Sequence, residues 1–343
     1  MMRSIRDKLS AQNEAVQPMK AIVVDSDHPD HPLSWEEVPD PECGPDEVLV
    51  DIHATAVNRA DLRQRDGLYP PPPGAPSYLG LEMAGIIAEV GDQVGEWQPG
   101  DRVCALLAGG GYAEQVVVPH QLLMRIPEEW DFIRAGAVPE VFYTAFVNLF
   151  MEAALQQGET LLVHGGASGV GTAAIQLARE AGCRVLVTAG TRAKLDRCLE
   201  LGAEFGVNYK ARDFAEAILE HTDGVDVVLD IAGGEYLERN LRLLKPKGRL
   251  VLIALLAGSR GQIDLGMMQS KRLHLIGSVL RSRSLKEKTQ IAREFKMRFW
   301  PLLVEGRIEP VIDAVLPIAE AEKAHEILAH NRNIGKVVLK VRD

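Results

Sequence analysis

The segment from Thr160 to Leu177 constrains this chain most, because it predicts a strand, a glycine-rich turn and a helix in immediate succession. Thr160–His164 is a short run of β-branched residues and leucine, typical of a strand buried in a parallel sheet. The turn that follows contains Gly165, Gly166, Gly169 and Gly171. Thr172–Leu177 continues as an apolar helix, whose first N–H groups and dipole favour an anion such as a pyrophosphate. This order of elements predicts a dinucleotide-binding turn.

The turn departs from a strict G-x-G-x-x-G pattern, because Ser168 stands where that pattern has a glycine. A purely structural turn can show similar glycines, but the strand before it and the helix after it are what cofactor binding requires. A nucleophile elbow, G-x-S-x-G, centred on Ser168 is the other interpretation. Val170 argues against it, because the elbow needs a small residue at that position.

Length and composition exclude several classes of protein. The chain has 343 residues, which predicts about two domains, and its formal net charge of −10 argues against nucleic acid or an anionic membrane as the main partner. No apolar run reaches transmembrane length, and residues 1–18 lack the apolar core of a signal peptide, so we expect a disordered tail there. The four cysteines are scattered, which predicts a reducing, cytoplasmic location.

The pattern of predicted secondary structure changes at about Val141. Before that point, short β-like runs are separated by glycine and proline turns, which predicts a compact, mostly antiparallel partial barrel. The predicted runs are 21–24, 47–57, 85–90, 102–107 and 115–118. From there, strands at 160–164, 184–188, 206–208, 225–229, 249–254 and 274–278 alternate with helix-length segments. This alternation predicts βαβ units, a parallel sheet and helices on both of its faces.

The C-terminal portion contains a long amphipathic stretch, Leu285–Glu305, a second helix, Ala319–His330, and a closing strand, Lys336–Val341. These elements lack glycine turns of the ligand-binding kind, so we expect them to pack back on the first domain.

Several segments recur here in an order and spacing that resemble one family: 57–62 (VNRADL), 80–82 (GLE), 99–101 (PGD), 166–171, 208–209 (NY) and 333–336 (NIGK). The chain resembles the medium-chain dehydrogenase/reductases, in the quinone oxidoreductase branch and its p53-inducible quinone oxidoreductase-like subgroup. The resemblance implies an α/β protein with a GroES-like partial β-barrel and a doubly wound Rossmann domain. It places a catalytic domain at 19–140 and 284–343, and the NADP-binding domain at 141–283. It also implies a homodimer paired through the edge strands of the Rossmann sheets, which would protect an exposed β edge.

The zinc ligands of the family's alcohol dehydrogenases have no counterpart in this sequence. Their catalytic cysteine corresponds to Asn58, and the histidine of their Gly-His-Glu motif corresponds to Leu81. Leucine cannot bind a metal, and an amide is a poor zinc ligand. We therefore expect no metal. Without one, alcohol oxidation is hard, whereas a quinone or an activated enone stabilises the charge that a hydride brings and needs only binding, alignment and exclusion of water.

The resemblance implies roles for individual residues. Asn58 and Thr144 are expected beside the nicotinamide, and Tyr69 beside the nicotinamide or the acceptor ring; Tyr69 and Asn58 are the candidate catalytic residues that position the two reactants. Asn58 and Thr144 could instead serve turn or helix hydrogen bonding, and Tyr69 could pack on the proline run 70–73. Glu82 is interpreted as a buried carboxylate at the domain junction or a proton donor. The remaining cofactor positions are Ser168, Gly169, Val170, Gly190, Lys194, Tyr209, Leu255, Val279 and Asn331.

The residues after the second Rossmann strand predict NADPH rather than NADH. NAD-binding turns usually have an acidic residue there that accepts hydrogen bonds from the ribose. Here Ala189-Gly190-Thr191 leave room for a phosphate, and Arg192 and Lys194 add positive charge. The family places Lys194, Tyr209 and Asn331 near the 2′-phosphate. The alternative is that Arg192 and Lys194 are ordinary solvated helix charges.

We therefore expect an NADPH-dependent, zinc-independent reductase of quinones. The alternatives are a reductase of α,β-unsaturated carbonyls and a dinucleotide-binding protein with little catalysis. Asn58, Tyr69 and Thr144 favour an enzyme, because a pure binding protein needs no nicotinamide cleft. The last Rossmann strand is bracketed by the basic residues Lys271, Arg272, Arg281 and Arg283, which are expected at a solvated edge or a subunit interface.

Overall fold

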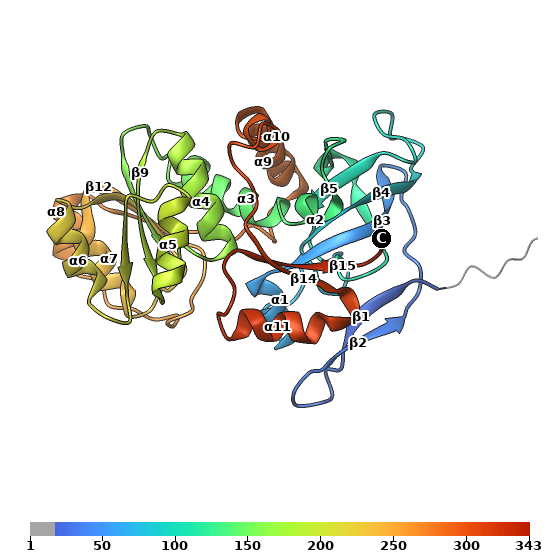
Figure 1. The fold of residues 1–343 in the computed structure, drawn as a ribbon, viewed down its shortest axis with the longest axis horizontal. Helices are drawn as coiled ribbons and strands as arrows, with labels where there is room; N and C mark the ends of the chain where they lie inside the picture. The colour runs from blue at the N-terminus through green and yellow to red at the C-terminus, as the bar shows by residue number, and fades with distance from the viewer. Residues whose placement is uncertain (1–17) are drawn as a thin grey trace, which may run out of the picture.

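The computed structural model describes residues 18–343, so the predicted tail, apart from residue 18, lies outside the described residues. Two sheets form the two ends of the elongated molecule and meet at a junction between them (Figure 1). In the described part of the chain, no helix is long and apolar enough to cross a membrane.

The first sheet is parallel and has six strands in the order β10-β9-β8-β11-β12-β13. Its strands are β8 (Thr160–His164), β9 (Arg184–Ala189), β10 (Phe205–Asn208), β11 (Val225–Asp230), β12 (Leu244–Leu252) and β13 (His274–Gly277). The connecting helices are α4 (Gly169–Glu180), α5 (Arg192–Glu200), α6 (Phe214–His221), α7 (Tyr236–Leu243) and α8 (Leu265–Lys271). The order reverses at β8, so the predicted doubly wound sheet is confirmed.

Alternating residues of each strand enter two separate cores, which is why the strands read as continuous apolar runs. Leu161 and Val163 of β8 pack with Leu177 of α4 in one core. Leu162, between them, packs with Ile218 of α6 in the other core. Side chains point to opposite faces with a period of two, so helices must cover both faces.

The second sheet has seven strands. Six of them are in the order β14-β15-β3-β4-β5-β7, and the seventh, β6, pairs with β3. These strands are β3 (Glu47–Val57), β4 (Glu82–Val90), β5 (Arg102–Leu106), β6 (Gln115–Pro119), β7 (Met124–Arg125), β14 (Ile312–Pro317) and β15 (Lys336–Lys340). All its pairs are antiparallel except β14–β15. A separate hairpin joins β1 (Lys20–Val24) to β2 (Leu33–Glu37). The predicted antiparallel barrel is confirmed, whereas β2, β7 and β14 were not predicted.

The C-terminal segment returns to this second sheet, where β15 lies between β14 and β3. The predicted amphipathic stretch forms two helices, α9 (Leu285–Arg298) and α10 (Trp300–Val304), with α11 (Ala321–Ala329) after them. The break follows from Pro301, which lacks the N–H that a continuous helix needs. The predicted domain limits remain a prediction, and the one at residues 140/141 falls inside helix α3 (Pro139–Phe146).

Short helices and one bridge complete the junction between the sheets. The remaining elements are α1 (Arg59–Arg65), η1 (His120–Leu122), α2 (Phe132–Gly136), the π-helical turn η2 (Val147–Glu152) and η3 (Ile318–Glu320). Ser168 of the glycine turn forms an isolated parallel bridge with Gly335, and the Gly335 N–H donates to the Ala167 carbonyl at 2.8 Å. This contact brings the start of β15 against the glycine turn, although the two are far apart in sequence.

Candidate active site

The glycine turn has the geometry of an anion cradle. Ser168 caps α4, and its Oγ accepts a hydrogen bond from the Gly171 N–H at 3.0 Å, while Gly169 and Val170 form the first residues of the helix. A Cβ at residue 171 would lie 2.4 Å from the carbonyl oxygen of Gly165, which no side chain could occupy. The helix therefore begins where its free N–H groups and dipole favour a pyrophosphate, as the sequence predicted.

A cluster of cations lies at the carboxyl end of β9. The Lys194 ammonium donates to the Asn331 carbonyl at 2.6 Å, and Arg59 donates to the Asn331 side-chain oxygen at 2.7 Å. Tyr209 and Lys210 lie against the other side, where the Tyr209 hydroxyl is 3.0 Å from the position that a Gly190 Cβ would take. Burial lowers the pKa of Lys194, opposed by Asp313, and the nearby charges of Lys210 and Arg59 lower it further.

This cluster contains the predicted Gly190, Lys194, Tyr209 and Asn331 and adds two cations that the sequence did not indicate, Arg59 and Lys210. Like charges this close repel one another in the absence of an anion. Arg192, in contrast, pairs with Asp196 at 2.7 Å on a largely exposed helix face. Arg192 is therefore a solvated helix charge and lies outside the cluster.

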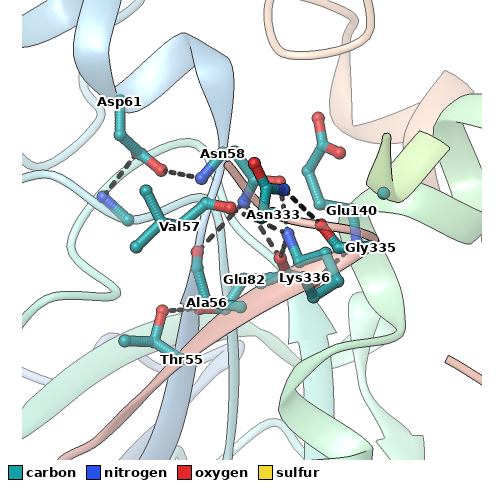
Figure 2. Close-up of polar contacts among 12 residues, drawn as sticks. Thr55, Ala56, Val57, Asn58, Asp61, Glu82, Glu140, Asn333, Gly335 and Lys336 are labelled. Atoms are coloured by element: carbon teal, nitrogen blue, oxygen red, sulfur yellow. Dashed lines mark hydrogen bonds and ion pairs between the residues drawn. The ribbon is translucent and has the colours of Figure 1, made fainter. Parts of the chain in front are cut away.

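Figure 2 shows a buried ion pair at the junction, between Lys336 and Glu82. The Lys336 ammonium contacts Glu82 Oε1 at 2.7 Å and donates to Asn58 Oδ1 at 2.6 Å and to the Val57 carbonyl at 3.1 Å. Asn58 Nδ2 also donates to Glu82 Oε1, at 2.9 Å. Glu82 is fully buried and Lys336 is 3% exposed. Glu82 therefore stabilises the junction, and Asn58 is held in one orientation with its amide oxygen already bound to a cation.

Helix α3 carries two further polar groups to the same place. The Glu140 N–H donates to Glu82 Oε2 at 2.9 Å, which fixes the start of the helix. Thr144 lies one turn farther along, and its hydroxyl is buried with no hydrogen-bond partner in residues 18–343. A buried hydroxyl without a partner is costly, so this one is suited to a group of the cofactor or acceptor.

A second polar network supports the Asn58 backbone. Asp61 accepts from the Asn58 N–H at 2.8 Å and from the Gly80 N–H at 3.0 Å. Burial raises the pKa of Asp61 to about 6, partly offset by these two hydrogen bonds. The Tyr112 hydroxyl lies 3.2 Å from His325 Nε2 and 3.4 Å from Asp61 Oδ2, so the network reaches α11.

The Tyr69 loop is held by Arg281, which lies in the turn after β13 of the parallel sheet. Arg281 donates to the Tyr69 carbonyl at 3.2 Å, to the Ala108 carbonyl at 2.7 Å and to the Gln64 side-chain oxygen at 2.6 Å. Its guanidinium lies 5.3 Å from the centre of the Tyr69 ring. Arg281 is 5% exposed, so the expected solvated edge is wrong for this residue. The reason is that its side chain turns across the junction to satisfy three oxygen acceptors.

Leu255 and Val279 follow the carboxyl ends of β12 and β13, and both are exposed. Their position fits the edge of a parallel sheet where ligands bind. Their predicted cofactor contacts stay a prediction.

Sequence reasoning found the glycine turn but missed Arg59, Lys210, Glu140, Arg281 and the role of Lys336. One signal was present for Lys336, because a lysine that opens an apolar strand is unusual unless it is paired. The others depend on contacts between distant segments, which no local pattern reveals.

Comparisons with known proteins agree with this architecture. Residues 44–128 match the family model for an alcohol dehydrogenase GroES-like domain, and residues 169–295 match the one for a zinc-binding dehydrogenase. A quinone oxidoreductase of Mus musculus is 34% identical over 301 residues, which cover 85% of this chain and 88% of the relative.

Two solved structures superpose over nearly the whole chain. An NAD-dependent alcohol dehydrogenase has 31% identity and a TM-score of 0.82, covering 94% of this chain and 100% of that one. A quinone oxidoreductase of Pseudomonas syringae pv. Tomato DC3000 has 28% identity and a TM-score of 0.83, with the same coverage of 94% and 100%.

Proposed function

Because the chain belongs to the medium-chain dehydrogenase/reductase family, in its quinone oxidoreductase branch, we propose that it is an oxidoreductase that reduces quinones with NADPH and needs no zinc. The main support for this proposal is the Thr144 hydroxyl, which is buried and has no hydrogen-bond partner in the described residues. It lies at the junction where Lys336 and Glu82 already fix the Asn58 side chain. Bound NADPH supplies the hydride. The residues of this chain bind and orient the two reactants and exclude water from between them.

The cation cluster supports the choice of NADPH. Lys210 and Arg59 lie close enough to Lys194 to lower its pKa, and Tyr209 and Lys210 lie against Gly190. Strand β9 ends without a carboxylate that would repel a phosphate. A charge-assisted contact to phosphate contributes about 1.5–3 kcal/mol, or roughly ten- to a hundredfold in affinity. We therefore expect NADPH to bind more tightly than NADH by at least this factor.

The ion pair supports a reaction without zinc. The Asn58 oxygen, at the position of a zinc ligand in related alcohol dehydrogenases, accepts a hydrogen bond from the Lys336 ammonium, and Leu81, at the position of a second ligand, is buried. A divalent cation at this place would have to approach the ammonium and would find an amide and a leucine instead of thiolate and imidazole. The positive charge that Glu82 requires is already supplied by Lys336.

Two further properties are part of the proposal. The outermost strand β13 offers an edge for pairing with a second copy of the chain, which supports a homodimer. The cysteines Cys43, Cys104, Cys183 and Cys198 are all free thiols, which supports a reducing, cytoplasmic location.

The test is NADPH oxidation against a panel of ortho-quinones, para-quinones and enones, with and without a chelator, together with metal analysis of the purified protein. We expect quinone-dependent oxidation that survives the chelator and no stoichiometric zinc. Lys194→Ala should weaken NADPH binding roughly tenfold or more and leave NADH binding unchanged. Arg192→Ala is the matched control, because that side chain is exposed and pairs with Asp196. Equal affinities for the two cofactors in the unmutated protein would contradict the NADPH proposal, and zinc-dependent activity would contradict the metal-free one.

A further inference from the structure

Glu140 is an acidic side chain at the junction that the ion pair does not use. Both oxygens of Glu82 are engaged, Oε1 by Lys336 and Asn58 and Oε2 by the Glu140 N–H. Glu140 contributes only its backbone to these contacts. Within residues 18–343 its carboxyl group forms no ion pair, and the neighbouring Thr144 hydroxyl, which is not within normal hydrogen-bond distance of any group, acts on it only weakly and lowers its pKa. Figure 2 shows that this carboxyl points away from the Lys336 contacts, and the side chain is half-buried.

The position of Glu140 ties it to the expected reaction centre from two directions. Thr144 is four residues along the same helix, so the two side chains lie on one face of α3. Through its N–H and Glu82, Glu140 is also one residue away from the Asn58 amide. Asn58 and Thr144 are the two residues proposed to lie beside the nicotinamide, and Glu140 is linked to the first through Glu82 and to the second through helix α3.

The charges around Glu140 come from three other elements, namely Lys336 of β15, Glu82 of β4 and Asp61 of α1. Burial raises the pKa of Glu140 to about 7; the Lys336 ammonium opposes this increase, and the two carboxylates add to it. A carboxyl group with this pKa is protonated in part of the molecules at neutral pH, as a general acid must be.

We propose that Glu140 is the proton donor of the reaction, an inference that rests on the proposed quinone reduction. Hydride delivery to a quinone leaves negative charge on an acceptor oxygen. Glu140 transfers its carboxyl proton to that oxygen, and the resulting carboxylate takes a proton back from solvent through its exposed side. One acceptor, one NADPH and one proton thus give one hydroquinone and one NADP⁺, and all atoms and electrons balance.

The inference is tested with the full chain by measuring kcat and kcat/KM for a para-quinone and an enone from pH 5.5 to 9. In the native protein, both should fall as the pH rises through about 7, because the required form of Glu140 is the protonated one. Glu140→Gln should lower kcat roughly a hundredfold and abolish this pH-dependent fall, because an amide has no transferable proton in this range. Glu140→Asp should restore part of kcat together with a pH-dependent fall.

One binding measurement and one control variant separate this role from a structural one. NADPH affinity, followed by nucleotide fluorescence, should stay within about twofold of native in Glu140→Gln, because the backbone contact to Glu82 remains. Glu216→Gln, an exposed residue on α6, is the matched control and should leave kcat and the pH profile unchanged.

The outcomes also separate this inference from the proposed function. If no acceptor supports NADPH oxidation by the native protein, the proposed function is wrong. If native activity is present but Glu140→Gln keeps the full kcat or the same pH-dependent fall, only the role of Glu140 is wrong. A flat native profile between pH 6 and 8 overturns the role without any variant, even if Glu140→Gln fails to fold.

Discussion

Replacement of Lys336 by methionine tests whether the buried ion pair stabilises the protein. Methionine keeps most of the volume and removes the ammonium, which contacts Glu82 at 2.7 Å, Asn58 at 2.6 Å and the Val57 carbonyl at 3.1 Å. Glu82 then remains fully buried with its charge uncompensated, since its other contacts are the Asn58 amide and the Glu140 N–H. The variant therefore removes one charge and leaves its partner in a medium of low dielectric constant.

The expected cost follows from the burial of both partners. Removal of one member of a buried pair typically lowers the free energy of unfolding by about 3–5 kcal/mol. Removal of both charges, in Lys336→Met/Glu82→Gln, leaves a neutral site that still has an acceptor for the Glu140 N–H. The double variant should therefore be less destabilised than the sum of the two single variants by about 2 kcal/mol or more.

The assay is urea unfolding followed by tryptophan fluorescence for the native protein, both single variants and the double variant at one pH. Lys340→Met is the matched control, because it lies on the same strand β15 and pairs with Asp343 at the surface. Its unfolding midpoint should barely change. A cost below about 1 kcal/mol for Lys336→Met, or strict additivity in the double variant, would refute the reasoning.

Three further predictions follow from other contacts. Arg281→Ala should raise the KM for the acceptor more than it lowers kcat, because it frees the Tyr69 loop that Arg281 holds; steady-state kinetics with an unchanged KM would contradict this. Gly171→Ala should abolish tight cofactor binding, because its Cβ would lie 2.4 Å from a backbone carbonyl oxygen; a nucleotide titration with native affinity would contradict this. Burial lowers the pKa of His325, beside Tyr112, to about 3, so the unfolded chain takes up this proton first and stability should fall as the pH drops below about 6.5. The full contribution of His325 to this loss of unfolding free energy is on the order of 3–5 kcal/mol. His325→Gln should therefore reduce the loss seen in unfolding curves from pH 7 to 4, and an unchanged loss would contradict the assignment.

The sequence predicted those parts of the fold that depend on local pattern. The bounds of β3 and β8 agree with the predicted runs 47–57 and 160–164, because continuous apolar or alternating residues and flanking turns specify both. Strand β2 was missed because Leu33–Glu37 has little apolar periodicity and is defined by its pairing with β1. Strand β14 was missed for a similar reason, since Ile312–Pro317 is half exposed and pairs with β15.

The candidate site was predictable only where one segment contains the whole signal. The glycine turn is such a segment, because strand, turn and capped helix are contiguous. The cation cluster is not, since Arg59, Lys194 and Lys210 belong to three separate segments that meet at Asn331 and Gly190. The sequence therefore predicted NADPH from Arg192 and Lys194, of which only Lys194 belongs to the cluster.

The balance of charge at the junction explains why an exchangeable proton is expected there. Three acidic side chains, Asp61, Glu82 and Glu140, lie around one ammonium, that of Lys336. Lys336 contacts Glu82 directly, so it compensates that carboxylate first. Asp61 accepts from two backbone N–H groups, yet burial still raises its pKa to about 6. Among the described residues, Glu140 accepts from no backbone N–H group and has only the Thr144 hydroxyl nearby, and burial raises its pKa to about 7. One cation cannot neutralise three buried carboxylates, so the least compensated one retains its proton near neutral pH. Because the Glu140 side chain is also partly exposed, its carboxyl can exchange its proton with solvent, as the proposed proton donor must.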